Sequence, residues 1–207
     1  MSELVVAVDI DDVLRPSVYP VSDAYAAHHG LTFELPAVMV NGVLKSMLDV
    51  FKEGTPHLEE EDIIDHIEEI LCRPEIIDVE PIQGAVEGIA NLSEKGKLVA
   101  VSSCPAIIKD QTESWIEDWF KGRFEDVHIL GERWGRGYLI DKWQVMQESG
   151  ATHIIDDLIQ NSVKAGKIGA KAVLFGQYPW NQTDELPEHV TRCENWPEVV
   201  EYFDARD

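Results

Sequence analysis

The stretch that most constrains this chain is Val5–Val8, an apolar run that leads directly into three aspartates, Asp9, Asp11 and Asp12. Such a run predicts a buried strand of a parallel sheet. Ligand sites of open α/β sheets lie beyond the carboxyl ends of their strands. Because carboxylates this close repel one another, the cluster favours a site for a hard cation such as Mg²⁺, which prefers oxygen ligands. The alternative is an Asp-rich turn without a chemical role.

The composition limits the class of protein and its partners. The 207 residues suit one domain, or one domain with a large insertion, and 44% are hydrophobic, which is enough for a folded core. Acidic residues number 39 against 17 Lys plus Arg, and the net charge of −22 disfavours nucleic-acid polymers and anionic membranes as partners. No stretch approaches the roughly 18 apolar residues of a membrane span. Three widely spaced cysteines predict a reducing, cytoplasmic location; no oligomeric state is predicted.

Short apolar runs alternate with helix-like segments over most of the chain. The runs lie at residues 4–8, 98–101, 127–130, 153–155 and 172–175. Apolar residues recur at helical spacing between them, at Ala85, Val86, Ile89 and Ala90 and again at Trp115, Ile116, Trp119 and Phe120. Trp196 and Tyr202 predict a last helix that docks on the core. This alternation predicts an α/β fold with a Rossmann-like parallel sheet and right-handed crossovers.

Residues 15–79 interrupt this alternation. One expected helical stripe comprises Val43, Leu44, Met47, Leu48 and Phe51, a second comprises Ile63, Ile64, Ile67, Ile70 and Leu71, and a further helix is expected at residues 22–29. Because amphipathic helices must pack against something, we predict a helical cap domain at 15–79, inserted after the first strand of a core domain made of residues 1–14 and 80–207. Such a cap would overhang the acids and exclude water. The alternative is a helical layer of a single compact domain.

Further polar side chains lie near the ends of later strands. They are Ser102 and Ser103 after residues 98–101, Asp156 and Asp157 after residues 153–155, and Lys142, which precedes Asp156 by 14 residues. The strand ends of a parallel sheet gather at one edge, so these groups can converge. The set suits phosphoryl transfer, because a carboxylate can attack a dianionic phosphate monoester only where a metal, a lysine and hydrogen-bond donors compensate the charge.

In these motifs the chain resembles the haloacid dehalogenase superfamily of phosphotransferases, over nearly its whole length. The resemblance rests on Asp9 and Asp11 after the first strand, Ser102 or Ser103 after the second, and the acid pair Asp156 and Asp157. It implies that Asp9 is a nucleophile forming a phosphoaspartate and that Asp11 is the general acid/base. It also implies a Mg²⁺ site with Asp9, the Asp11 backbone carbonyl, Asp157 and Asp156, and a phosphoryl group held by the serine and Lys142.

A narrower resemblance is to the 5'(3')-deoxyribonucleotidase branch of that superfamily. It rests on Pro105 after the serines and on the stretch that begins at Gln177 and ends at Asn181. The branch often has Gly where this chain has Asp12. It also carries a lysine on the helix after the serine motif, where this chain offers only Lys109, so Lys109 and Lys142 both remain candidates for the catalytic lysine.

The resulting expectation is a Mg²⁺-dependent phosphatase that hydrolyses a small phosphate monoester, most similar to a nucleotidase. Residues 15–79 contain 13 acids and four Lys plus Arg, which disfavours polynucleotide substrates. The alternatives are a phosphatase of another small metabolite and a non-catalytic phosphate-binding protein on the same scaffold.

Several residues have two interpretations in the sequence. Arg15 is expected to contact a substrate phosphate or to form a solvated or cap salt bridge. The aromatic residues Tyr19, Tyr25, Phe33 and Phe51 are expected to line a base-binding pocket or to form the core of the cap. The seven histidines show no metal-site spacing, so structural or surface roles are expected for them.

Overall fold

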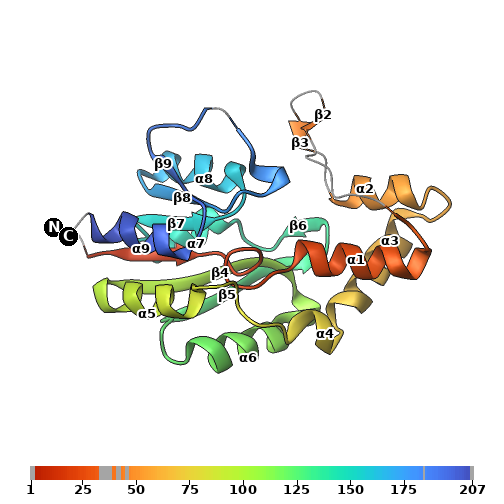
Figure 1. The fold of residues 1–207 in the computed structure, drawn as a ribbon, viewed down its shortest axis with the longest axis horizontal. Coiled ribbons are helices and arrows are strands. Elements are labelled where there is room, and N and C mark those ends of the chain that lie inside the picture. The colour runs from red at the N-terminus through yellow and green to blue at the C-terminus, as the bar shows by residue number, and fades with distance from the viewer. Residues whose placement is uncertain (1–2, 33–38, 41–42, 45–46, 184, 206–207) are drawn as a thin grey trace.

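The computed structural model describes residues 3–32, 39–40, 43–44, 47–183 and 185–205. The main strands are β1 (Val5–Val8), β4 (Lys97–Pro105), β5 (Asp126–Arg133), β6 (Arg136–Tyr138), β7 (His153–Asp156), β8 (Lys171–Phe175) and β9 (Val190–Cys193). They form one sheet in the order β6-β5-β4-β1-β7-β8-β9 (Figure 1). Six strands are parallel, and β6 runs antiparallel to β5 at one edge. The predicted α/β fold with a Rossmann-like parallel sheet is confirmed.

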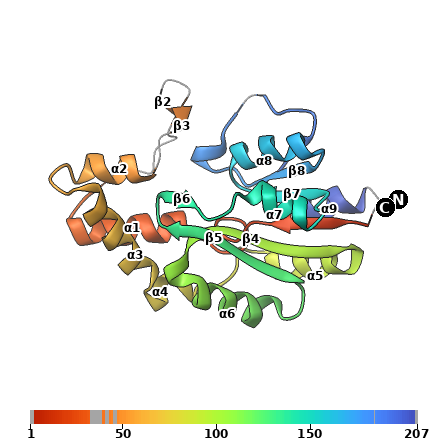
Figure 2. The same cartoon turned by 180° about the vertical axis from the view of Figure 1, so that it is seen from behind.

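Helices cover both faces of this sheet (Figures 1 and 2). One face carries α5 (Ala85–Lys95), α6 (Lys109–Phe120) and α9 (Trp196–Asp204), and the other carries α7 (Lys142–Glu148) and α8 (Ile159–Ala165). Along β1, Val6 and Val8 belong to the first core, whereas Val5 and Ala7 belong to the second. Burial on both faces explains why the strand is apolar without interruption. The predicted last helix is α9, and its Trp196 is fully buried.

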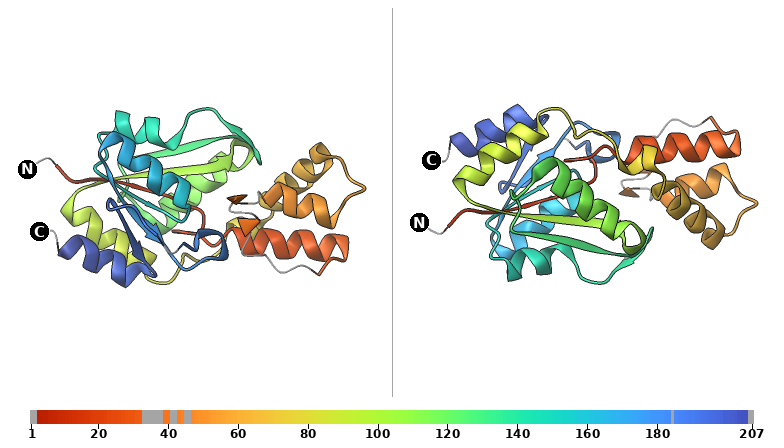
Figure 3. Two further views of the ribbon diagram at one scale, coloured as in Figure 1. Left: turned by 90° about the horizontal axis from the view of Figure 1, so that it is seen from above. Right: turned by 90° about the horizontal axis from the view of Figure 1, so that it is seen from below.

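A group of helices lies beyond the carboxyl end of β1, opposite the two chain termini (Figure 3). They are α1 (Val18–His29), α2 (Met47–Gly54), α3 (Glu60–Leu71) and α4 (Pro74–Ile77). Their shared core includes Tyr25, Phe51, Ile63, Ile67 and Ile70. Short 3₁₀ helices occur at Ala106–Ile108, Gly166–Ile168 and Pro179–Asn181. The helices expected within residues 15–79 are therefore present, while the division of the chain into domains 1–14 with 80–207 and 15–79 stays a prediction.

One expected helical stripe is wrong at its start. Val43–Leu44 form the strand β3, which pairs antiparallel with β2 (Met39–Val40), and α2 begins only at Met47. The sequence Asn-Gly stands between the two short strands, and this dipeptide is a strong hairpin signal. Helical spacing of Val43 and Leu44 with Met47 was therefore coincidental.

The strand β4 is longer than the expected residues 98–101, so Ser102 and Ser103 lie on the strand itself. Pairing with β5 continues, through an irregularity in register, as far as Pro105 opposite Gly131. A Cβ atom at position 131 would lie 2.5 Å from the Ser103 carbonyl oxygen, so only glycine allows this approach. Among the described residues, none of the helices has the length and apolar character that crossing a bilayer requires.

Candidate active site

Three buried carboxylates converge at the carboxyl ends of two neighbouring strands. Asp9 directly follows β1, and its backbone N–H donates to the Ile155 carbonyl of β7 over 2.9 Å. Asp156 ends β7 and Asp157 follows it. Side-chain oxygens of the three aspartates all lie within 4.8 Å of one another. We call Asp9, Asp156 and Asp157 the acid cluster. Its members come together because β1 and β7 are adjacent parallel strands.

Lys142 supplies a buried positive charge to the acid cluster. Its Nζ lies 2.5 Å from Asp9 Oδ2 and 2.9 Å from Asp156 Oδ2. The residue begins α7, whose start is fixed by a reciprocal capping box between Asp141 and Gln144. The other candidate lysine, Lys109, is exposed at the start of α6, and its Nζ lies 3.7 Å from Glu113. Of the two lysines, the structure brings only Lys142 to the acid cluster.

Amide and indole groups orient the paired acids of β7. Asn161 Nδ2 donates to both carboxylate oxygens of Asp156, at 3.1 and 3.0 Å. Trp180 Nε1 donates to Asp157 Oδ2 at 2.6 Å, and Asn181 Nδ2 donates to the Asp157 carbonyl at 3.0 Å. Neither Trp180 nor Asn181 was a site residue predicted from the sequence. Their position after β8 was the signal that could have found them, because the carboxyl ends of parallel strands lie at the edge of the sheet where the acid cluster lies.

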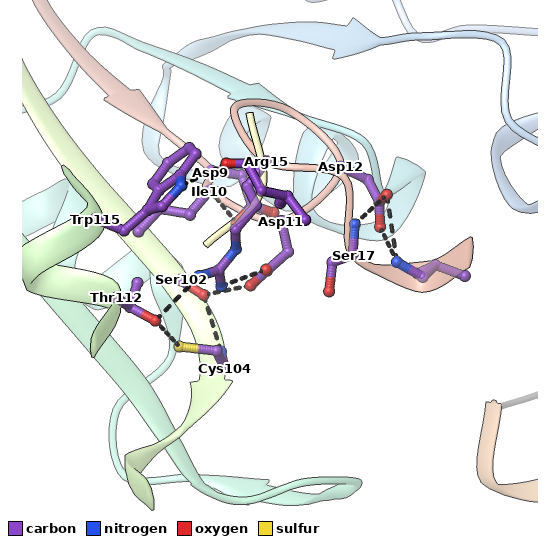
Figure 4. A network of polar contacts seen from close by, with 12 residues as sticks. Asp9, Ile10, Asp11, Asp12, Arg15, Ser17, Ser102, Cys104, Thr112 and Trp115 are labelled. Carbon is purple, nitrogen blue, oxygen red and sulfur yellow. Dashed lines mark hydrogen bonds and ion pairs between the residues drawn. The ribbon is translucent and has the colours of Figure 1, made fainter. Parts of the chain in front are cut away.

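Asp11 belongs to a second network, beside the acid cluster (Figure 4). Its Oδ1 accepts a hydrogen bond from Arg15 Nη2 at 2.8 Å, and its Oδ2 accepts one from Ser102 Oγ at 2.8 Å. Arg15 is itself only 3% exposed and lies over the Trp115 ring, 5.5 Å from its centroid. Its guanidinium also reaches Thr112 Oγ1 at 3.4 Å. Arg15 therefore forms a salt bridge, but the arginine is buried and not solvated, and its partner is Asp11.

Asp12 connects the acid-bearing loop to the first helix. Its φ of +56° lies in the left-handed region, where Gly and Asn are more usual. Its carboxylate accepts the backbone N–H groups of Ser17 and Val18, at 3.1 Å each, and its carbonyl accepts the Tyr178 hydroxyl at 2.8 Å. Through these hydrogen bonds Asp12 holds the start of α1 and Tyr178 beside the acid-bearing loop.

Burial makes the acid cluster electrostatically costly without further positive charge. Burial raises the pKa of Asp9 well above its usual value, Lys142 opposes this, and the charge of Asp156 adds to it. Burial and the charges of Asp156 and Asp9 likewise raise the pKa of Asp157. Burial alone would lower the pKa of Lys142, but Asp156 and Asp9 raise it overall, so its ammonium group is charged. Three carboxylates against one lysine fit a divalent cation with a preference for oxygen ligands.

The pKa of Asp11 moves in the opposite direction. Burial would raise the pKa of Asp11, but the charge of Arg15 and the hydrogen bonds from Arg15 and Ser102 lower it below its usual value. Asp11 is therefore a carboxylate in this arrangement. Its side chain is a quarter exposed, whereas that of Arg15 is buried, so solvent reaches part of the acid.

The two serines face different surroundings. Ser102 is fully buried, and its hydroxyl donates to Asp11 and accepts the Cys104 N–H at 2.9 Å. Ser103 is half-buried and lines a cavity of about 220 Å³. The cavity is also lined by Asp141, Lys142, Trp143, Met146, Leu158, Gln160, Asn161 and Lys164. Ser103 and Lys142 therefore border the same solvent-accessible space, while Ser102 does not.

The four aromatic residues separate into different environments. Tyr25 and Phe51 are fully buried in the core of α1–α4, so the core interpretation holds for both. Tyr19 is 44% exposed, and its ring centroid lies 5.8 Å from that of Trp180, the residue that donates to Asp157. Phe33 lies outside the described residues. Only Tyr19 among the three described rings therefore offers an exposed face near the acid cluster.

The raised pKa values predict how stability depends on pH when divalent cations are removed. Burial raises the pKa of Asp12 to about 7, and the pKa values of Asp9 and Asp157 are raised too. Because unfolded Asp titrates near about 3.9, the folded chain binds more protons than the unfolded chain above that pH. The free energy of unfolding in EDTA should therefore fall as pH rises. Asp12 alone should account for a fall of up to about 4 kcal/mol between its unfolded and its folded pKa.

Thermal unfolding between about pH 5 and pH 8 measures this dependence. Millimolar Mg²⁺ should raise Tm most at the upper end, because a cation favours the ionised acids. The variant Asp12→Asn should show a shallower dependence in EDTA. A Tm in EDTA that rises over this range would contradict the electrostatic account.

The fold is similar to that of haloacid dehalogenase-like hydrolases of known structure. One from Streptococcus pneumoniae has a TM-score of 0.68 and 13% identity, over 97% of this chain and 98% of that one. A haloacid dehalogenase-like protein from Agrobacterium tumefaciens has a TM-score of 0.67 and 13% identity, over 99% of each chain. A HAD-hydrolase from Bacillus subtilis, bound to magnesium, has a TM-score of 0.61 and 12% identity, over 99% of this chain and 100% of that one.

These likenesses show that the chain has the haloacid dehalogenase fold. The sequence itself matches no family model and no curated protein. At such low identity the likeness concerns the fold alone, so the chemistry has to be argued from the side chains at the sheet edge.

Proposed function

We propose that this chain is a Mg²⁺-dependent phosphomonoester hydrolase that acts on a small substrate. The observation that carries the proposal is the environment of Asp9. This carboxylate directly follows the central strand β1, lies within 4.8 Å of Asp156 and Asp157, and pairs with buried Lys142. A carboxylate can attack a phosphoryl group when nearby positive charge offsets the negative charge of both groups. Lys142 supplies one such charge, and a cation bound by the neighbouring acids would supply more.

The acid cluster supports the metal part of this proposal. Asp9 and Asp157 would hold Mg²⁺ together with the Asp11 backbone carbonyl, and Asp156 would be a ligand or would act through Lys142. When bound, Mg²⁺ would reduce the repulsion between the negative charges of the substrate phosphate and of the carboxylates. Trp180 and Asn161 keep the paired acids in position through their hydrogen bonds.

We propose that Asp9 is the nucleophile and that Asp11 is the general acid/base. Asp9 attacks phosphorus, the bond to the leaving alkoxide breaks, and a phosphoaspartate forms. Asp11 gives the alkoxide a proton and afterwards takes one from the water that hydrolyses the phosphoaspartate. Because Asp11 is ionised while it pairs with Arg15, acid catalysis requires that this pair loosen when substrate binds.

We assign the phosphoryl contact to Ser103 in preference to Ser102. Ser103 borders the cavity that Lys142 also lines. Ser102 is buried, and its hydroxyl already donates a hydrogen bond to Asp11 and accepts one from the Cys104 N–H. We therefore propose that Ser102 positions the general acid/base and that Ser103 and Lys142 hold the phosphoryl oxygens.

The substrate class is proposed from the surroundings of the site. Tyr19 lies beside Trp180, which is stacked on Tyr178 with ring centroids 4.6 Å apart. An exposed aromatic face next to the acids favours a substrate with a planar group, so a nucleoside monophosphate is the leading candidate. Another small phosphorylated metabolite is the second candidate. None of the three cysteines, all of which lie in the described part of the chain, is in a disulfide, which supports a reducing, cytoplasmic compartment.

A substrate panel tests the proposed function directly. Phosphate release from nucleoside monophosphates, sugar phosphates and a generic aryl phosphate is measured with Mg²⁺ and with EDTA. Release that requires Mg²⁺ is expected for at least one small ester. Absence of release from every ester would favour the non-catalytic phosphate-binding alternative.

Tyr19→Ala tests the nucleotide assignment. If a base stacks on Tyr19, its loss costs about 1–3 kcal/mol, so kcat/KM for the nucleotide should fall roughly 5- to 150-fold. The aryl phosphate should be affected much less. Trp119→Ala is the matched control, because Trp119 is a similarly exposed aromatic residue on α6. An unchanged ratio between the two substrates in Tyr19→Ala would remove the support for a nucleotide.

A further inference from the structure

Two adjacent histidines at the end of α1 meet a third histidine that is distant in sequence. His28 and His29 are the last residues of α1, and His66 lies in α3. One ring nitrogen from each lies within 4.8 Å of the other two. His29 Nε2 and His66 Nδ1 are 2.9 Å apart, and the His28 and His66 ring centroids are 4.0 Å apart. We call His28, His29 and His66 the histidine cluster.

The spacing of the histidine cluster is close to that of a metal site. Zinc–nitrogen bonds of about 2.0–2.1 Å in tetrahedral geometry place ligand nitrogens about 3.4 Å apart. The hydrogen-bonded pair His29 Nε2 and His66 Nδ1 is closer than this value, and no pair of the three nitrogens exceeds 4.8 Å, so one ion could replace that hydrogen bond as the group that joins the three rings. Because His28 is exposed and the other two are half-buried, an ion has access from solvent and a fourth position would remain for water.

The surroundings of the histidine cluster favour a cation. The carboxyl end of a helix carries partial negative charge, and His28 and His29 stand there at the end of α1. Burial lowers the pKa of His29 and of His66, and so does the charge of His28, and this direction favours the neutral imidazole that binds a metal. The charge of Glu69 also acts on His66 and would favour a cation, whereas Arg73 opposes one.

We propose that His28, His29 and His66 form a binding site for a divalent transition-metal ion such as Zn²⁺, which links the end of α1 to α3. The site differs from the acid cluster in its ligands. Imidazole nitrogens select Zn²⁺ and related ions, whereas the carboxylates at the sheet edge suit Mg²⁺. The alternative is that the three rings only pack against one another and against Tyr25, whose ring centroid lies 4.4 Å from that of His29.

Zn²⁺ titration by calorimetry, in excess Mg²⁺ to fill the acid cluster, separates these alternatives. The wild-type chain should bind one Zn²⁺ more tightly than His66→Gln or His28→Gln, by at least about 10-fold, since even groups behind the ligands alter metal affinity that much. His28 is exposed, so its substitution should leave folding intact. His128→Gln, a half-buried histidine on β5, is the matched control and should bind like wild type.

Thermal unfolding gives a second, independent measurement. Zn²⁺ should raise the Tm of the wild type and of His128→Gln, and should raise the Tm of the two cluster variants much less, because the ion links α1 to α3 only when its ligands are intact. Circular dichroism checks that every variant is folded. If His28→Gln and His66→Gln are folded and keep the wild-type affinity for Zn²⁺, the proposal is wrong, whatever the outcome of the phosphatase assays.

Discussion

Asp9→Asn is expected to abolish phosphate release, lowering kcat by roughly four orders of magnitude or more, as removal of an attacking group does in other enzymes. Asn has nearly the same shape as Asp, but its amide cannot attack phosphorus to form a covalent intermediate. The measurement is single-turnover and steady-state phosphate release with the best ester of the panel, in saturating Mg²⁺.

The stability of this variant provides the control. Burial and the charge of Asp156 raise the pKa of Asp9, so removing its charge relieves repulsion in the acid cluster. Its Tm in EDTA should therefore equal or exceed that of the wild type, although the contact with Lys142 is weakened. Near-normal turnover in a preparation free of other phosphatases would exclude Asp9 as the nucleophile, while a large loss of Tm would point to a structural role.

Lys142→Met should cause the second-largest loss of activity and, unlike Asp9→Asn, a loss of stability as well. Among the described residues, Lys142 is the cation seen to contact two members of the acid cluster. Removing one partner of a buried ion pair costs about 3–5 kcal/mol, because the charges left behind are uncompensated. Methionine keeps much of the side-chain volume, so the expected loss of Tm in EDTA comes from charge.

The pattern across conditions distinguishes this explanation from a packing defect. Mg²⁺ should restore part of the lost Tm, since it supplies positive charge to the same carboxylates, but kcat should stay depressed because phosphoryl oxygens have lost their contact. Lys109→Met is the matched control. Lys109 is exposed and lies 3.7 Å from Glu113, so its loss should change neither Tm nor kcat appreciably. Equal effects of the two substitutions would overturn the choice of Lys142.

The fold was predictable from the sequence because its signals are local. Apolar runs such as Val5–Val8 are long enough to span a buried strand, and burial on both faces removes the need for polar alternation. Strand limits were less predictable. β4 continues through Ser102 and Ser103 because β5 pairs with it, and the approach depends on Gly131, a residue far along the chain.

The proximity of Asp9, Asp156 and Asp157 was predictable for the same reason. Parallel strands end at one edge, so an acid at the end of each neighbouring strand must lie near the others. Their chemical roles stay proposals. The prediction of a helix at Val43 was wrong. Over so few residues, the two-residue periodicity of a strand cannot be told apart from helical spacing.

The sequence by itself determined the α/β class, the helical nature of much of residues 15–79, and the edge at which the acids gather, since each depends on local periodicity and on the general geometry of parallel sheets. Only the tertiary structure decided which side chains meet. It paired Lys142 with Asp9, Arg15 with Asp11 and Trp180 with Asp157, and it brought His66 to the end of α1. Such partners lie on different elements, and their contacts depend on how those elements pack and on the direction of each side chain, which spacing along one segment does not encode.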